Sequence, residues 1–129
     1  MVLSHEDDDT NTHPYWYARV VGVFHVEVRY RGSETPDQAP KRLDVLWVRW
    51  FARRTNLKSG WAVRRLPCIG FYSHDEHDAF GFISPNDVIR GIHLIPAFRY
   101  GRTPDLLPPS IARHESENNE DWDWYFVNM

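Results

Sequence analysis

The pattern of apolar and polar positions along the chain predicts a protein built mainly from β-strands. Residues 43–51 form the most apolar segment, with seven apolar side chains in nine positions and many of the β-branched and aromatic types that favour strands. Asp44 interrupts one of its two faces and Arg49 the other, so neither face is polar along its whole length. We therefore expect an inner strand covered on both faces. A helix is the alternative, but the prolines before the segment and the basic loop after it favour a strand.

Residues 15–30 show the clearest alternation, with Val20, Phe24 and Val26 on one face and charged residues on the other. Sixteen residues is long for one strand, so Gly22 is expected to introduce a bulge or a bend. The following segment, 31–41, is rich in Gly and Pro. It predicts a loop that joins 15–30 and 43–51 as an antiparallel hairpin.

Shorter strands are predicted farther along the chain, at 61–66, 68–72 and 92–98. Ser84, Pro85 and Asp87 resemble the start of a helix, with Ser84 as the N-cap, and predict a short α-helix over residues 85–90. Residues 122–127 are too apolar for a free tail and are expected to add a strand or to dock on the body.

Together these elements predict a mainly β fold, a single small SH3/BAH-like β-barrel with one short α-helix. The predicted domain spans residues 14–104. Residues 1–13 are expected to be a disordered acidic tail, and 105–129 a Pro-rich, acidic extension that carries the docking aromatic segment.

The length of 129 residues suits one domain that can bury a core without metals or disulfides. The single cysteine, Cys68, excludes an internal disulfide and indicates a reducing compartment, the nucleus or the cytoplasm. No segment approaches the roughly 20 apolar residues of a membrane span, so no membrane partner is expected. The acidic N-terminal residues resemble neither a secretory signal nor a transit peptide.

The net charge of −3 conceals an uneven distribution. Residues 1–14 carry −4, residues 15–104 carry +6 and residues 105–129 carry −5. A basic body between acidic ends suits a protein that binds a polyanion, with ends that compete for the same surface. The alternative is that the acidic ends only keep the chain soluble.

Catalytic chemistry has little support. The chain lacks a nucleophile elbow, a phosphate-binding glycine loop and an HExxH motif. His74 and His77 lie among three acidic residues, but this cluster alone offers too few converging ligands for a tight metal site. Cys68 follows Pro67 in an apolar segment, where a cysteine is usually a small buried hydrophobe. We therefore expect a non-enzyme without a metal or cofactor.

Basic and aromatic residues are concentrated between positions 49 and 65. Arginine binds phosphate through two parallel hydrogen bonds, and exposed aromatic rings stack on bases. This combination predicts a DNA-binding face made by Arg49, Arg53, Arg54, Lys58, Trp61, Arg64 and Arg65. Two alternatives remain open: the aromatic residues, including Trp50 and Phe51, could line a cage for a methylated lysine, or they could belong to the core beside a solvated basic loop.

Several short sequence motifs, taken together, resemble those of one known family. They are residues 13–20 (HPYWYARV), 46–51 (LWVRWF), 79–83 (AFGFI), 87–90 (DVIR), 92–98 (IHLIPAF), 101–103 (GRT), 106–113 (LLPPSIAR) and 121–129 (DWDWYFVNM). In this order they resemble the C-terminal region of transposase-like proteins of mushroom-forming fungi, the Plavaka group of CACTA (En/Spm-like) DNA transposons. The order of elements is also similar, more loosely, to BAH and SH3-like barrels of chromatin proteins.

The resemblance implies a non-catalytic accessory domain of a transposase-like protein, because the RNase H-like catalytic domain of that family has no counterpart here. It carries no catalytic residues over to this chain. DNA is the expected partner of the basic face. The alternative is a protein-interaction module that binds a histone tail or packs against other domains of the transposase.

Overall fold

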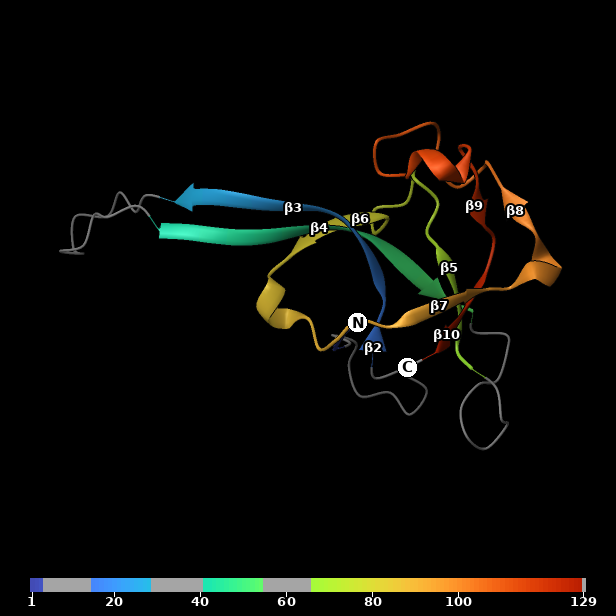
Figure 1. Cartoon of the computed structure of the whole chain (residues 1–129), viewed down its shortest axis with the longest axis horizontal. Helices are drawn as coiled ribbons and strands as arrows, with labels where there is room; N and C mark the ends of the chain where they lie inside the picture. Colours follow the sequence, from blue (N-terminus) through green and yellow to red (C-terminus); the bar gives the residue numbers. More distant parts are fainter. Residues whose placement is uncertain (4–14, 29–40, 55–65, 129) are drawn as a thin grey trace.

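The structure, a computed structural model, describes residues 1–3, 15–28, 41–54 and 66–128, and in this part of the chain it is mainly β (Figure 1). The strands are β1 (Val2–Leu3), β2 (Tyr15–Trp16), β3 (Ala18–Val28), β4 (Lys41–Arg53), β5 (Cys68–Phe71), β6 (Phe80–Ile83), β7 (His93–Pro96), β8 (Arg102–Thr103), β9 (Asp121–Trp122) and β10 (Tyr125–Asn128). Three one-turn 3₁₀ helices accompany them: η2 (Pro85–Asp87), η3 (Phe98–Tyr100) and η4 (Glu115–Glu117). The predicted mainly β class is confirmed.

One antiparallel sheet organises the molecule, in the strand order β3-β4-β5-β10-β7, with β6 paired to β4 as well. Two small pairs, β1–β2 and β8–β9, complete the described strands. The edge strands β3 and β7 do not pair with each other in the described residues, so the sheet is open there and not closed into a barrel. The strand predicted at 92–98 is present as β7 and pairs with β10.

The predicted hairpin is confirmed: β3 and β4 pair antiparallel from Ala18↔Trp50 to Val28↔Lys41. The register shifts between Val20 and Gly22, so the bulge lies where the glycine predicted it. The two strands leave the body together and project beyond the rest of the sheet (Figure 1). The outer part is a two-stranded ribbon, because β6 pairs with β4 only from Leu46 to Arg49.

Both ends of the described chain belong to the body. The aromatic C-terminal segment forms β10, an inner strand between β5 and β7, with Tyr125 and Val127 buried. It is therefore part of the sheet and not an extension of it. At the other end, β1 pairs with β2 and Val2 is buried, although residues 1–13 were expected to form a tail. Residues 4–13 lie outside the described part.

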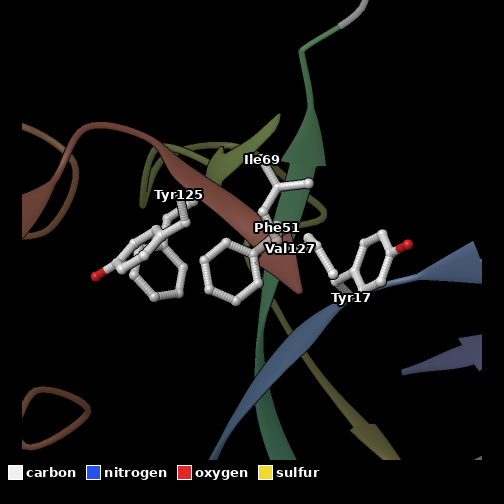
Figure 2. Packing of buried hydrophobic residues seen from close by; sticks show 6 residues of the cluster. Tyr17, Phe51, Ile69, Tyr125 and Val127 are labelled. Atoms are coloured by element: carbon white, nitrogen blue, oxygen red, sulfur yellow. The ribbon is translucent and has the colours of Figure 1, made fainter. Parts of the chain in front are cut away.

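The core is a cluster of buried side chains in which Tyr17, Phe51, Ile69, Phe71, Tyr125 and Val127 pack together (Figure 2). The rings of Phe51 and Phe71 stack with their centroids 4.2 Å apart, and Tyr125 meets both edge-on. Large aromatic side chains bury much apolar area per residue, which suits a domain of this size. The predicted strand at 68–72 is confirmed as β5, and all of its residues are buried.

The predicted α-helix over residues 85–90 is wrong. Ser84 does act as the N-cap, and its Oγ accepts a hydrogen bond from the Asn86 N–H at 3.3 Å. The turn is nevertheless only the 3₁₀ helix η2, and the chain is extended again at Val88. Val88 and Ile89 are β-branched and Gly91 follows, so the sequence offers little to propagate a helix. No helix in the described residues is long and apolar enough to cross a membrane.

Candidate functional site

Arg49, predicted to contact DNA, lies inside the molecule with only 1% of its surface exposed. Its Nη1 and Nη2 donate to the two carboxylate oxygens of Asp121, each at 2.9 Å. Its Cζ also lies 3.7 Å from the centre of the Phe71 ring. This corrects the assignment of Arg49 to the DNA-binding set, because a buried guanidinium engaged by a carboxylate cannot reach a phosphate.

Asp121 is shared by a second buried arginine, Arg113, whose Nε and Nη2 donate to the same carboxylate at 3.1 and 2.8 Å. Arg113 Nη2 also donates to the backbone oxygen of Leu107. Burial by itself raises the pKa of Asp121, but the hydrogen bonds from Arg49 and Arg113 outweigh it and leave the pKa lowered. The three side chains join β4, β9 and the segment between them, and they act as scaffold.

Only Arg53 and Arg54 remain of the predicted basic face within the described residues, and both are half-buried at the end of β4. The Cζ of Arg54 lies 4.7 Å from the ring centre of Tyr100 and 5.1 Å from that of Trp124. The other predicted members, Lys58, Trp61, Arg64 and Arg65, lie outside the described part of the chain.

An aromatic pocket of about 250 Å³ opens near the base of β4. It is lined by Trp16, Trp50, Phe51, Tyr72 and Asp78, from β2, β4 and the residues on either side of the turn between β5 and β6. The backbone connects these segments: the Trp50 N–H donates to the Ala79 oxygen at 3.0 Å, and the Tyr72 N–H donates to the Trp50 oxygen at 3.4 Å. We call this the aromatic pocket.

Two tryptophans form adjacent walls of the aromatic pocket. The rings of Trp16 and Trp50 are inclined at 79°, with their centroids 5.9 Å apart. Gly81, on β6, makes room for the second wall, because a Cβ at this position would lie only 2.7 Å from Trp50 Nε1. Gly81, the glycine of the AFGFI motif, thus lets β6 pack directly against the indole ring of Trp50.

Asp78 is the charged member of the lining, and its side chain is 74% exposed, with Oδ1 3.2 Å from His77 Nδ1. Among the described residues, the lining contains no lysine or arginine. Aromatic faces carry negative partial charge and attract cations, and a carboxylate at the rim adds to this attraction. The aromatic pocket therefore has the electrostatic character of a cation site.

The sequence pointed to part of this pocket. Trp50 and Phe51 belonged to the aromatic cage considered as an alternative, and both line the pocket. Trp16, Tyr72 and Asp78 were missed, since each stands in a different segment and only the pairing of strands brings them together. Nothing in their local sequence distinguishes them from other aromatic or acidic positions.

Other features of the described residues offer less chemistry. A second pocket of about 260 Å³ lies between β3, β4, β6 and residues 88–94, and its lining is mainly aliphatic. Arg19, which lines it, is held by Glu117 at 2.7 Å. No group of three or more His, Cys, Asp or Glu residues converges as a metal site in the described ranges. Cys68 is buried, which raises the pKa of its thiol.

Comparison of the chain with protein-family models, with curated proteins and with solved structures gives no match in any of the three. The transposase resemblance therefore stays a prediction from the sequence.

Proposed function

We propose that this chain is a non-catalytic protein-interaction module whose aromatic pocket binds a methylated lysine side chain of a partner peptide. The observation that carries the proposal is the lining itself, four aromatic residues and one carboxylate around about 250 Å³. A lysine methylammonium group on its slender methylene chain is a ligand of matching charge and shape.

The two tryptophan walls suit a compact cation. Trp is the best aromatic partner for a cation, and each ring within about 6 Å contributes roughly 0.5–2 kcal/mol, more when water is excluded. Walls inclined at 79° present two faces to one occupant, whereas parallel rings would favour a flat one. Phe51 and Tyr72 add further apolar surface for the methyl groups.

Methylation of the lysine is expected to favour binding because it reduces the hydration of the ammonium group. An unmodified ammonium is strongly hydrated and carries three N–H donors that need acceptors. In the described part of the lining, Asp78 is the one charged acceptor, so donors left without partners would disfavour the unmodified lysine. Each methyl group removes a donor and adds apolar surface for the rings.

The wider context supports the same proposal. A small mainly β domain with no catalytic motif fits an accessory role, and the looser similarity to SH3/BAH-like barrels points to peptide ligands on chromatin. A role within a transposase-like protein, in the nucleus, follows from the sequence resemblance. Within that role the methylated peptide could belong to a histone tail or to the transposase itself.

The experiment is a calorimetric titration of the chain with one lysine peptide in unmodified, mono-, di- and trimethylated forms. We expect binding of methylated forms and at least tenfold weaker binding of the unmodified form. Trp16→Ala is expected to weaken binding about tenfold, from the loss of one cation–π wall. Trp16→Phe should retain an intermediate affinity.

Phe98→Ala is the matched control, because Phe98 is an aromatic residue with 68% exposure that does not line the pocket. It should bind like the original chain, and circular dichroism should show all variants folded. Equal affinity for all four peptides, or equal loss in the Trp16 and Phe98 variants, would refute the proposal.

DNA binding is the second candidate, favoured by the position of Arg54 beside aromatic rings. Its guanidinium lies over Tyr100 and Trp124, and Phe98 and Tyr100 are exposed on the adjacent turn η3. Exposed rings beside arginines suit stacking on bases. This function predicts a complex in a gel shift at low salt that weakens steeply as salt rises. Replacing Arg53, Arg54, Arg64 and Arg65 together with Ala should abolish it, and no complex at low salt excludes it.

A further inference from the structure

The outer half of the β3–β4 hairpin exposes a continuous apolar face. Residues that pair directly across antiparallel strands point to the same side, and the pairs Phe24↔Val45 and Val26↔Leu43 alternate with polar pairs. Nearer the body, Trp47 pairs with Phe82 on β6 and lies on the same side. We call this surface the ribbon face; its members are Phe24, Val26, Leu43, Val45, Trp47 and Phe82.

These side chains are packed against each other but not covered. Phe82 is 69% exposed and Phe24 47% exposed, and Val26 and Leu43 are exposed as well. The Phe24 and Trp47 ring centroids are 6.5 Å apart, and Trp47 stacks on Phe80 at 5.9 Å. Along β4 the same side continues inward to Arg49 and Phe51, which are buried. The ribbon face therefore continues the core-facing side of β4 into the part of the hairpin that projects beyond the body (Figure 1).

The opposite face of the ribbon carries polar and charged side chains in its outer part. His25 Nδ1 donates to Asp44 Oδ1 at 2.6 Å, and Arg42 Nε donates to the same oxygen at 3.3 Å. The hydrogen bond from His25 is the main reason that the pKa of Asp44 is lowered. Glu27 lies opposite Arg42 in the strand register, on the same side of the ribbon. The outer part of this opposite face is thus polar, while Val23 and Leu46 lie on it nearer the body. A polar side opposite an apolar side is the pattern of a sheet that packs on one side.

A two-stranded ribbon alone is at best marginally stable in water, and an exposed apolar patch of this kind usually marks an interface. We propose that the ribbon face binds the ribbon face of a second copy of this chain, with the two ribbons antiparallel about a two-fold axis. The proposal is independent of the function of the aromatic pocket.

The shape of the ribbon face supports a second copy as the occupant. Its base is aromatic, with Trp47 and Phe82, and its outer part is aliphatic, with Val26 and Leu43, up to the outermost described pair, Val28↔Lys41. An antiparallel arrangement places the bulky base of one copy on the small tip of the other, so that large and small side chains face each other in both halves. No charged side chain interrupts this side between Leu43 and Trp47.

The exposed area of the ribbon face determines how stable the proposed dimer is expected to be. An exposed phenylalanine presents roughly 200 Å², so the exposed parts of the ribbon face amount to roughly 400–500 Å² per copy and about 1,000 Å² in a dimer. This is near the lower limit of specific interfaces. A reversible dimer is therefore expected, and not an obligate one.

Sedimentation velocity over a concentration series up to about 1 mM tests the proposal. We expect a monomer–dimer equilibrium that Phe24→Asp weakens at least tenfold. The matched control is Val23→Asp: Val23 is the neighbouring residue, 60% exposed, but it pairs with Leu46 on the opposite side. The control should leave the equilibrium unchanged within about twofold.

Leu43→Lys, at the exposed tip, is a second variant in case Phe24→Asp fails to fold, and it should also weaken the dimer at least tenfold. A monomer at every concentration would overturn the proposal and leave the ribbon face to a different partner. Equal weakening by Val23→Asp and Phe24→Asp would also overturn it, since the dimer would then not depend on this face.

Discussion

The two halves of the β3–β4 hairpin differ in which of their side chains are exposed to solvent. In the inner half, Arg49 is buried with Asp121 and stacks on Phe71, while Phe51 enters the core. In the outer half, Phe24 and Leu43 are exposed, and the charged residues Arg42 and Asp44 pair in the solvent. Both halves belong to the same two strands, and the bulge between Val20 and Gly22 separates them.

The difference shows that exposure along this hairpin depends on what packs against it. The inner half has β5 and β6 beside it, and Asp121 on β9 supplies the carboxylate that makes burial of Arg49 tolerable. The described part of the outer half has only its own partner strand. Variants that act on one half and spare the other therefore test the comparison.

The largest contrast is expected between two aspartates. Asp121→Asn leaves two buried guanidinium groups without their carboxylate, and it should lower the free energy of unfolding by about 3–5 kcal/mol. Asp44→Asn should cause little measurable change, because its partners are exposed. Urea unfolding followed by tryptophan fluorescence measures both.

Arg49→Met sharpens this result, because it removes one of two cations and leaves the Arg113–Asp121 pair intact. It should therefore destabilise less than Asp121→Asn. Equal losses for the two aspartate variants would contradict the distinction between the halves.

An intermediate contrast is expected between two glycines. A Cβ on Gly70, in β5, would lie 2.6 Å from the backbone oxygen of Asp123, so Gly70→Ala must shift backbone and should cost about 1–3 kcal/mol. A Cβ on Gly22 would meet the end of the Phe24 side chain at 3.0 Å, and that ring can rotate away. Gly22→Ala should cost less than about 1 kcal/mol. Thermal unfolding of the two variants in one buffer makes the comparison, and a larger loss for Gly22→Ala would contradict it.

The smallest effect is expected at alkaline pH and reports on the inner half alone. Burial raises the pKa of Tyr17 to about 12, with a further contribution from Tyr15 and an opposing one from Arg53. Because the pKa is higher in the folded state than the ordinary value of 10, this tyrosine stabilises the fold fully below pH 10, and the contribution is lost as the pH rises toward 12.

Ultraviolet titration of tyrosinate in the original chain and in Tyr17→Phe should show one late-ionising group that the variant lacks. Stability measured across the same pH range should fall less steeply in the variant. Amplitude lost near pH 10 instead would show that Tyr17 ionises like an exposed tyrosine.

The strand pattern of the hairpin was open to prediction because it is local. Alternation over residues 15–28, the apolar run in β4 and the bulge at Gly22 depend on neighbouring residues and on backbone preferences. The mainly β class followed from them. The N-cap at Ser84 was also local, and so was correct, but the length of the turn after it was not.

The site depended on contacts between distant segments. The residues of the aromatic pocket span positions 16 to 78, and no spacing rule connects them. Arg49 was assigned to the DNA-binding face for the same reason, because its partner lies 72 positions away. The placement of β10 in the middle of the sheet brings Asp121 to Arg49, and no pattern within β4 contains that information.

The sequence by itself thus determined the class of structure, the long hairpin and its bulge, since these follow from side-chain alternation and backbone preference. Tertiary structure alone decided that the described sheet stays open between β3 and β7, that Arg49 is scaffold, and that Trp16 packs edge-on against Trp50 at one pocket. The physical reason is that burial and charge pairing are properties of contacts, and these contacts join residues that are far apart along the chain.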